Sequence, residues 1–496
     1  MTAPLGRVHP LVLVTVGGTL VATGLGMLAC AVVGYLDSRA GFSFTLSGFF
    51  TLAIAAVLVG SSRSRISEMK TVGPVTGLAA VTIAWVAASA VGAVPMILAG
   101  TFDSYLDAFF EAVSGFTTTG ATLIGDIESQ PDAVLVWRSL SQWLGGIGII
   151  VLVVAVAPIS GPGIQRAFYA ETSGMTSDRL TPRIIDTAKV ITLIYLVLSI
   201  AAASAYLIAG MNPFDAVNHS MTTVATGGYS TKNLSIGAFD SRAIETVAIA
   251  FMALGGINFA FYWKAIRRRD TRPQLNEVLV YLFLLGAISG AVAISLALSD
   301  GATGIGGLVI DPLFAVTTVM TTTGYTTADF DEWNSFARAT ILLTMFIGAC
   351  AGSTAGGIKV IRVMLLGRSA IQELQRQVRP RIVQVLRIGQ HVYKEDVRRA
   401  VLGFFLIYLL LFAVGVLLMA ASGLDLVSAI SGASSTLNMI GPGLGEIGAG
   451  ENFEAMPDLA RATSCFLMIA GRLEVFTVVA LLTAVVDRTR EALQRA

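Results

Sequence analysis

Long stretches without a charged residue limit what this chain can fold into. Five of them approach or exceed the roughly 20 residues that a helix needs to cross a bilayer: Thr71–Phe102, Val190–Phe214, Val278–Ser299, Ala339–Ile358 and Ala400–Leu424. Charged residues make up only 13% of the 496 residues, whereas about 25% is usual in soluble proteins. We therefore expect a polytopic membrane protein.

Basic and acidic residues are sorted into alternate gaps between the apolar stretches. We expect about ten spanning segments, near residues 10–35, 45–61, 72–98, 134–157, 187–209, 244–263, 276–298, 339–358, 400–421 and 462–486. Lys and Arg gather after every second segment, as in Lys264–Arg272 and Lys359–Arg399, and acidic residues gather in the other gaps, as in Asp103–Asp132. By the positive-inside rule, the basic gaps and both termini are cytoplasmic. The net charge of +1 gives no indication of a nucleic-acid partner.

Four of the outer gaps share one pattern. Each opens with Asp and continues with a short apolar stretch, small hydroxylated residues and glycine: DAFFEAVSGFTTTG (107–120), DAVNHSMTTVATG (215–227), DPLFAVTTVMTTTG (311–324) and DLVSAISGASSTLNMIG (425–441). An arginine follows near the start of the next segment each time, at Arg138, Arg242, Arg338 and Arg461. The glycines recur about every 107 residues, which indicates internal repeats. Because every unit starts and ends inside, the repeats are parallel and can surround an axis along the membrane normal.

The predicted fold class is therefore an all-α polytopic membrane protein with four parallel helix–pore-loop–helix repeats around a central pore. Two extra transmembrane helices precede the repeats. The expected boundaries are 1–70 for these two helices, then 71–170, 171–272, 273–395 and 396–496 for repeats one to four, the third of which contains an intramembrane gating loop.

The apolar stretch after each Asp is too short to cross a membrane. Asp107–Thr117 would form a helix about 16 Å long, roughly half the thickness of the hydrocarbon core. We expect Asp to cap its N-terminus and the negative end of its dipole to point at the bilayer midplane. Non-helical backbone is tolerated at that depth only where it lines a protein cavity. Four Thr/Gly loops around an axis can supply the ring of oxygens that replaces a cation's hydration shell.

These motifs are similar to those of a known family. The filter-like sequences TTTG, ATGGYST, TTTGY and NMIGPGLG, together with GACAGSTAGGIKVIR and GRLEVFT, resemble the Trk/Ktr/HKT superfamily of potassium transporters, specifically membrane subunits of the TrkH/TrkG type. The resemblance implies pore-mediated K⁺ uptake across a bacterial cytoplasmic membrane and a homodimer with one pore per protomer. It also implies a cytosolic TrkA-like regulatory ring, through which alone a nucleotide would act, and no covalently bound cofactor.

The resemblance also implies which residues form the filter. Their backbone carbonyls would come from Thr118, Thr119, Gly120, Ala225, Thr226, Gly227, Thr322, Thr323, Gly324, Met439, Ile440 and Gly441. Each loop then carries glycine at the selective position. The fourth loop departs from the threonine pattern at Asn438-Met439-Ile440, so we do not expect the site to be fourfold symmetric in detail.

The glycine-rich segment Gly348–Gly357 interrupts an apolar stretch that follows the third loop. Four glycines lower helix stability there by about 1 kcal/mol each relative to alanine. One interpretation is close helix packing through the GxxxG formed by Gly352 and Gly356. The family resemblance instead implies a mobile gate under the filter, made by Gly348, Gly352, Ser353, Thr354, Gly356 and Gly357.

Arg472 lies near the middle of the last apolar segment, where an arginine is costly unless it faces protein or water. It is predicted to be either half of a structural ion pair with another helix or a positive charge beside the pore. Glu474 is only two residues away and so lies on another face of a helix. The family has an arginine in this motif.

A basic region between repeats three and four is a candidate docking surface for the regulator. We place Lys359 and Arg362 at the cytoplasmic surface and expect a short hairpin around Gly389. The basic residues assigned to this surface are Arg362, Arg376, Arg379, Arg381 and Arg387. Plain positive-inside sorting accounts for the charge equally well.

Two other function classes make different demands on the sequence. An alternating-access symporter that couples K⁺ to H⁺ or Na⁺ would favour several ionisable residues at mid-membrane, where only Arg472 and Glu474 qualify. An enzyme is not expected, because the sequence offers no metalloprotease, P-loop or nucleophile motif.

Overall fold

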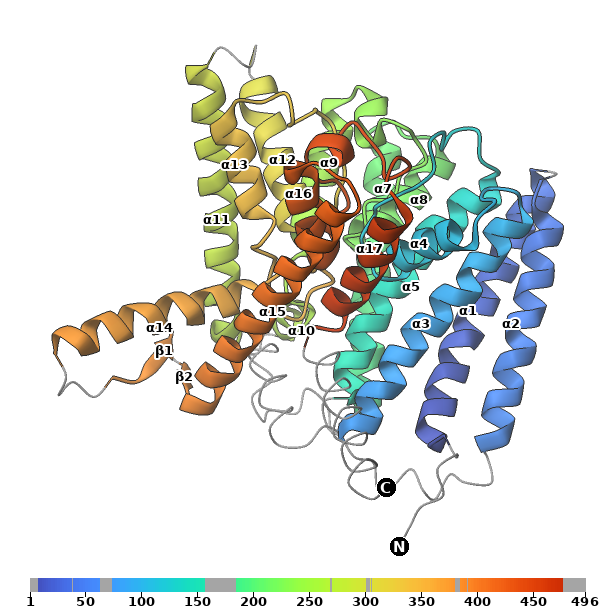
Figure 1. The fold of residues 1–496 in the computed structure, drawn as a ribbon, viewed down its shortest axis with the longest axis horizontal. Helices are drawn as coiled ribbons and strands as arrows, with labels where there is room; N and C mark the ends of the chain where they lie inside the picture. The colour runs from blue at the N-terminus through green and yellow to red at the C-terminus, as the bar shows by residue number, and fades with distance from the viewer. Residues whose placement is uncertain are drawn as a thin grey trace, which may run out of the picture.

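The computed structural model describes residues 8–37, 39–62, 74–156, 184–267, 270–299, 304, 306–379, 384–389 and 391–475. Within them the chain is mainly helical, and its long helices are α1 (Pro10–Leu36), α2 (Gly41–Ser62), α3 (Pro74–Leu98), α5 (Asp132–Val156), α7 (Ile184–Ile208), α11 (Arg272–Leu298) and α15 (Glu395–Ala421). Six helices of the described residues, all of these except α5, are long and apolar enough to cross a membrane. Figure 1 shows them as a bundle of roughly aligned rods.

Four short helices stand between these longer elements. They are α4 (Tyr105–Phe116), α8 (Pro213–Val224), α12 (Asp311–Met320) and α16 (Leu426–Asn438), and each is followed by an irregular loop and then by α5, α9 (Arg242–Gly255), α13 (Ser335–Thr344) or α17 (Asp458–Arg472). The short helices lie in one half of the bundle, at the upper end in Figure 1. Their buried sides are polar as well as apolar, since Ser434, Ser435 and Thr436 of α16 are fully buried.

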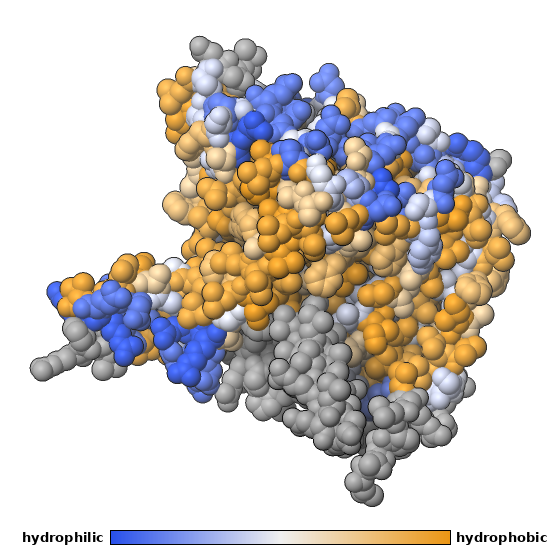
Figure 2. Space-filling view, in the orientation of Figure 1, coloured by the Kyte–Doolittle hydropathy of each residue, from blue (hydrophilic) through white to orange (hydrophobic). Residues whose placement is uncertain are grey.

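The outside of the bundle is apolar. Large side chains on the long helices are exposed, including Phe49 on α2, Phe283 on α11 and Leu410 on α15. Figure 2 shows this as a belt of hydrophobic residues below a hydrophilic upper end. Such a surface is suited to contact with membrane lipid, because exposed apolar patches of this extent are rare on soluble monomers.

Three predicted spanning segments differ from continuous helices. The segment near 244–263 is broken into α9 and α10 (Phe259–Ile266), which are bent by 87°. The segment near 339–358 leaves the helix after Thr344 and resumes as α14 (Val360–Val378), which extends sideways from the lower end of the bundle in Figure 1. The last helix, α17, ends at Arg472, and residues 476–486 of the predicted segment lie outside the described residues.

The predicted Asp caps are correct for only one short helix. Asp425 caps α16, whereas the N-cap of α4 is Ser104 and that of α8 is Asn212. Asp107 and Asp215 instead lie in the first turn, three residues after these caps. An acid there still interacts favourably with the helix dipole, which explains why the pattern looks like a cap in the sequence.

The four arginines of the repeated pattern join neighbouring units. Arg461 beyond the fourth short helix forms an ion pair of 2.6 Å with Asp107 on the first, and Arg242 beyond the second pairs with Asp311 on the third. Arg138 beyond the first donates to the carbonyl oxygen of Ser230 in the second loop, at 2.9 Å. The third and fourth units meet where Asp331, paired with Arg338, accepts a hydrogen bond from the backbone N–H of Gly445. The contacts therefore close a circle.

The predicted hairpin around Gly389 is confirmed. Strand β1 (Leu386–Ile388) pairs antiparallel with β2 (His391–Tyr393), and Arg387 lies opposite Val392. Gly389 adopts a φ of 57°, which favours glycine in a tight turn. The hairpin lies beside α14 at the end of the molecule opposite the short helices (Figure 1).

Candidate functional site

The four short helices end in the same unusual backbone conformation. A non-glycine residue adopts positive φ just after each one, and a glycine two residues later does so again. The first set is Thr118, Thr226, Thr322 and Met439, with φ of 57°, 53°, 55° and 59°, and the second is Gly120, Gly228, Gly324 and Gly441, with φ of 85°, 77°, 85° and 103°. Positive φ at a non-glycine residue costs about 1–3 kcal/mol, so its recurrence at four matched positions marks a common requirement.

This comparison corrects the register predicted for the second loop. Thr226 matches Thr118, and Gly228 rather than Gly227 matches Gly120. Ala225, assigned to the filter from the sequence, is the C-cap of α8 and matches Thr117, the C-cap of α4. By backbone conformation, Thr226, Gly227 and Gly228 therefore match Thr118, Thr119 and Gly120, and the triplets predicted in the first, third and fourth loops match one another.

Each of these glycines packs against the carbonyl oxygen of the neighbouring loop. A Cβ atom built on Gly120 would lie 2.2 Å from the oxygen of Gly227, and one on Gly228 would lie 1.9 Å from that of Thr323. The same atom on Gly324 would lie 1.8 Å from the oxygen of Ile440, and on Gly441 2.9 Å from that of Thr119. The glycine of loop one thus contacts loop two, that of loop two contacts loop three, that of loop three contacts loop four, and that of loop four contacts loop one. The loops therefore form a closed ring in which a side chain at any of the four glycine positions would collide with backbone.

Backbone carbonyl oxygens from all four loops meet in this ring, because each loop presents one of them to the glycine of a neighbouring loop. The negative ends of four helix dipoles also meet there. A cation that has lost its water can be bound by such a set of oxygens.

A cavity of about 70 Å³ lies on one side of the ring. Its lining includes the four glycines Gly120, Gly228, Gly324 and Gly441, so all four loops contribute to it. Three charged residues, Arg138, Lys232 and Glu451, also line this cavity, and the Lys232 ammonium lies 4.0 Å from the Glu128 carboxylate.

The glycine-rich segment lies against three of the four loops. The Thr354 hydroxyl donates to the carbonyl oxygen of Val224 at the end of α8 and accepts from the hydroxyl of Thr226 at 3.2 Å. The N–H of Gly356 donates to the Thr322 hydroxyl of the third loop at 2.6 Å. A Cβ atom on Gly356 would lie 2.3 Å from the carbonyl oxygen of Asn438, which precedes the fourth loop.

The segment is not helical, which contradicts the interpretation as helix packing through GxxxG. Gly352 and Gly357 adopt φ of 74° and 67°, outside the helical region. Ile347 and Ile358, the residues that flank the segment, form an isolated β-bridge. Next to it, a Cβ atom on Gly348 would lie 2.2 Å from the carbonyl oxygen of Gly356. The Ser353 hydroxyl donates to the Cys350 carbonyl within the segment.

Arg472 is buried and reaches the same segment. Its guanidinium donates to the carbonyl oxygens of Thr354, at 3.0 Å, and of Gly145 on α5, at 2.9 Å. Among the described residues its partners are carbonyl groups and the ring of Trp85 rather than a carboxylate. The ion pair considered for Arg472 is therefore absent from the part of the chain that the structure describes.

The surface positions predicted for Lys359 and Arg362 are wrong. Both side chains are buried; Arg362 forms an ion pair of 2.7 Å with Glu474 and lies over the ring of Phe404. The Lys359 ammonium donates to the carbonyl oxygen of Ala355. Arg376, Arg379 and Arg387 are exposed as expected, and Arg381 lies outside the described residues.

Comparison with known proteins identifies the family. A model of the TrkH family, described as a cation transport protein, matches residues 40–288 and 278–490. The Trk system potassium uptake protein TrkH of Escherichia coli K12 is 38% identical over 481 residues, which cover 96% of this chain and 97% of that protein. The chain belongs to the TrkH family. The related TrkG of Escherichia coli K12 is 34% identical over 82% of this chain and 84% of its own length.

A solved structure has the same fold as this TrkH family member. The crystal structure of the potassium transporter TrkH from Vibrio parahaemolyticus matches with a TM-score of 0.86 and 36% identity, over 95% of this chain and 98% of that one. Together with the apolar helices, the match makes this chain a multi-pass membrane protein.

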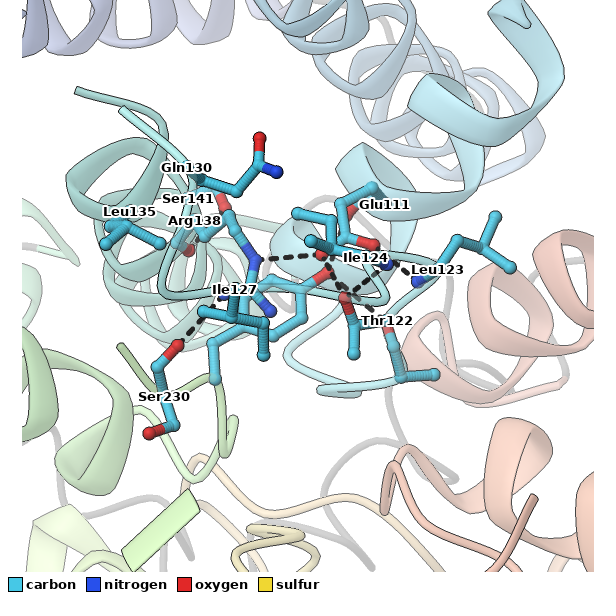
Figure 3. A network of polar contacts seen from close by, with 12 residues as sticks. Glu111, Thr122, Leu123, Ile124, Ile127, Gln130, Leu135, Arg138, Ser141 and Ser230 are labelled. Atoms are coloured by element: carbon cyan, nitrogen blue, oxygen red, sulfur yellow. Dashed lines mark hydrogen bonds and ion pairs between the residues drawn. The ribbon is translucent and has the colours of Figure 1, made fainter. Parts of the chain in front are cut away.

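Two acidic residues that hold the site of this TrkH family member were not expected there from the sequence. Glu111 was grouped with outer acidic residues but is buried, where it pairs with Arg138 and accepts hydrogen bonds from Thr122 and Leu123 (Figure 3). Glu277 on α11 accepts from the N–H groups of Ala351, within the glycine-rich segment, and of Ile361, just after it. A lone acid at the start of an apolar helix is the signal that could have identified Glu277.

Proposed function

We propose that this chain is the K⁺-conducting membrane subunit of a Trk-type uptake system. The closed ring of four glycines against four neighbouring carbonyl groups is the observation that carries the proposal. A channel filter needs loops from several units to converge on one axis with their oxygens directed inward. The names of the similar proteins, potassium uptake protein and potassium transporter, support K⁺ as the ion.

The filter in this proposal consists of twelve residues in four matched triplets. They are Thr118, Thr119, Gly120; Thr226, Gly227, Gly228; Thr322, Thr323, Gly324; and Met439, Ile440, Gly441. Carbonyl oxygens replace the water that K⁺ gives up on entry. Glycine at the last position of each triplet lets each loop approach the next closely enough to fix the size of the ring.

The glycine-rich segment acts as the gate in this account. Its contacts with Thr226, Thr322 and Asn438 place it against the ends of three short helices. Arg472 joins it to α5, and Glu277 holds it from α11. Release of these few hydrogen bonds would allow the segment to refold, since its glycines have little preference for one backbone conformation.

The remaining parts of the proposal concern partners and orientation. We place the glycine-lined cavity outside and α14 with its hairpin in the cytoplasm, as the positive-inside rule requires. Both termini are then cytoplasmic, the membrane is the bacterial cytoplasmic membrane, and the protein acts as a homodimer with a TrkA-like nucleotide-binding ring. The buried carboxylate Glu111 and the partly exposed carboxylate Glu474 are each paired with an arginine, which does not favour a proton-coupled symporter.

K⁺ flux in proteoliposomes tests the proposal. The purified protein is reconstituted with a K⁺ gradient and no gradient of H⁺ or Na⁺, and uptake is followed with and without an ionophore that clamps the pH. A conducting pore needs no gradient of a second ion, and it dissipates the K⁺ gradient when H⁺ movement through the ionophore balances the charge that K⁺ carries. Flux that requires a gradient of the second ion would contradict the pore and favour the symporter.

A further inference from the structure

The loops differ in the side-chain hydrogen bonds that connect them to the ends of their short helices. In the first loop the hydroxyls of Thr117 and Thr119 are 2.8 Å apart, and in the third loop those of Thr321 and Thr323 are also 2.8 Å apart. Thr117 and Thr321 are in turn each bonded to the carbonyl group four residues earlier in their short helix. These hydroxyl pairs connect each loop to the end of its helix.

The second loop lacks both hydroxyls. The matched positions are occupied by Ala225 and Gly227, so no side chain of the loop itself can make this connection. Two consecutive glycines, Gly227 and Gly228, would otherwise leave the loop with more conformational freedom than the other three.

Gln142 of α5 fills the position of the missing side chain. Its amide nitrogen donates to the carbonyl oxygen of Gly227 at 2.6 Å, and its amide oxygen accepts from the N–H of Tyr229 at 3.1 Å. The side chain is fully buried. A Cβ atom on Gly227 would lie 2.4 Å from the amide carbon of Gln142, so the glycine and the glutamine fit only together.

We infer that Gln142 is the positioning residue of the second filter loop and that it contributes to selection of K⁺ over Na⁺. The inference rests on the proposed function, because the carbonyl that it holds, that of Gly227, is the one that contacts Gly120 of the first loop. Gln142 belongs to the helix after the first loop, so one side chain sets the relative position of two loops. Without it, the buried Gly227 carbonyl and Tyr229 N–H lose their partners, which makes that backbone conformation less favourable.

Other contacts keep the rest of the loop in place. The Tyr229 hydroxyl donates to the carbonyl oxygen of Glu111 at 2.8 Å, and the Arg138 guanidinium lies 4.1 Å from the centre of the Tyr229 ring. Substitution of Gln142 should therefore make the Gly227 carbonyl group more mobile while the packing of the helices is preserved.

The test is the K⁺/Na⁺ permeability ratio of Gln142→Ala and Gln142→Met in lipid bilayers. We expect a reduction of at least roughly two- to tenfold, which is the range for the loss of one typical hydrogen bond, because Gln142 makes two. Methionine has a length similar to that of glutamine and no hydrogen-bonding amide. The methionine variant therefore tests the same effect on the permeability ratio if the alanine variant folds poorly. Ser139→Ala is the matched control, because this buried hydroxyl of α5 bonds only to Leu135 of its own helix among the described residues, and the ratio should not change.

A compensating variant separates positioning from a general structural role. Gln142→Ala combined with Ala225→Thr and Gly227→Thr gives the second loop the TTTG sequence of loops one and three, and the ratio should recover. The two loop substitutions with Gln142 present should lower it, since a side chain at position 227 would collide with the amide. An unchanged ratio in the single Gln142 variants, or no recovery in the triple variant, would overturn the inference.

The same experiment distinguishes this inference from the proposed function. Gly324→Ser changes the filter directly at another loop. If Gly324→Ser lowers the ratio and the Gln142 variants do not, only the role of Gln142 is wrong. If none of the variants changes the ratio, the loops are not the filter.

Discussion

Removal of one charge from the buried pair Glu111–Arg138 should destabilise the protein strongly. The carboxylate and guanidinium are 2.9 Å apart, and their side chains are 0% and 2% exposed. Glu111 also accepts from the Thr122 hydroxyl and the Leu123 N–H, and Arg138 donates to the carbonyl oxygen of Ser230 (Figure 3). The pair therefore joins the first short helix, its following loop, α5 and the second loop.

The size of the expected loss in stability follows from the burial of the charge that remains on Arg138. Glu111→Gln keeps the size of the side chain but leaves the Arg138 guanidinium, which is only 2% exposed, without a counter-charge. Breaking a buried pair in this way costs about 3–5 kcal/mol. The exposed pair Glu395–Arg398, at 2.6 Å, is the control, and Glu395→Gln should cost at most about 1 kcal/mol.

Thermal denaturation of the detergent-purified protein measures this difference. The fraction that remains monodisperse after heating gives an apparent midpoint for each variant. Glu111→Gln should lower the midpoint by much more than Glu395→Gln does, and Glu111→Leu combined with Arg138→Met should recover part of the loss, because no charge remains buried. Equal midpoints for Glu111→Gln and Glu395→Gln would refute the reasoning.

Three further predictions address the glycine-rich segment, the glycine-lined cavity and the hairpin. Deletion of Gly352–Ala355 should raise basal K⁺ flux without the regulator and leave the K⁺/Na⁺ ratio near wild type; a deletion variant that folds but conducts no faster would show that the segment is not a gate. Lys232→Ser should increase single-channel K⁺ current at low ionic strength and much less at high salt, because the removed charge at the cavity is screened there; an effect that does not depend on salt would contradict an electrostatic role. Deletion of Pro380–Tyr393 should abolish co-purification with the regulatory ring and preserve membrane insertion, and retained binding would refute docking at the hairpin.

The sequence predicts the long helices well because uncharged length is a strong local signal. α1, α3, α7, α11 and α15 all begin and end within about five residues of the predicted segments. The bend between α9 and α10 was not predicted, because a continuous apolar stretch gives no sign that Asn258 will start a new helix by capping it.

The register of the second loop could not be settled from the sequence either. ATGG contains two glycines, and either could match the single glycine of the other loops. The structure matches Gly228 to the other glycines because its φ is positive and that of Gly227 is not. Gly227 is required for another reason, since Gln142, 85 residues earlier in the chain, excludes a side chain there. Arg362 was placed at the surface for a similar reason, since its partner Glu474 is 112 residues away and no local pattern connects them.

The reversal potential under K⁺/Na⁺ bi-ionic conditions tests the central claim most directly. The protein is measured in planar bilayers as wild type, Gly228→Ser and Gly290→Ser, where Gly290 lies on α11 with open space around it. Each tenfold change in permeability ratio shifts the potential by about 59 mV. We predict a K⁺-selective wild type, the same potential for Gly290→Ser, and a shift toward zero for Gly228→Ser, whose Cβ would meet the Thr323 carbonyl. A Gly228→Ser potential equal to that of wild type would contradict the ring as the selectivity filter.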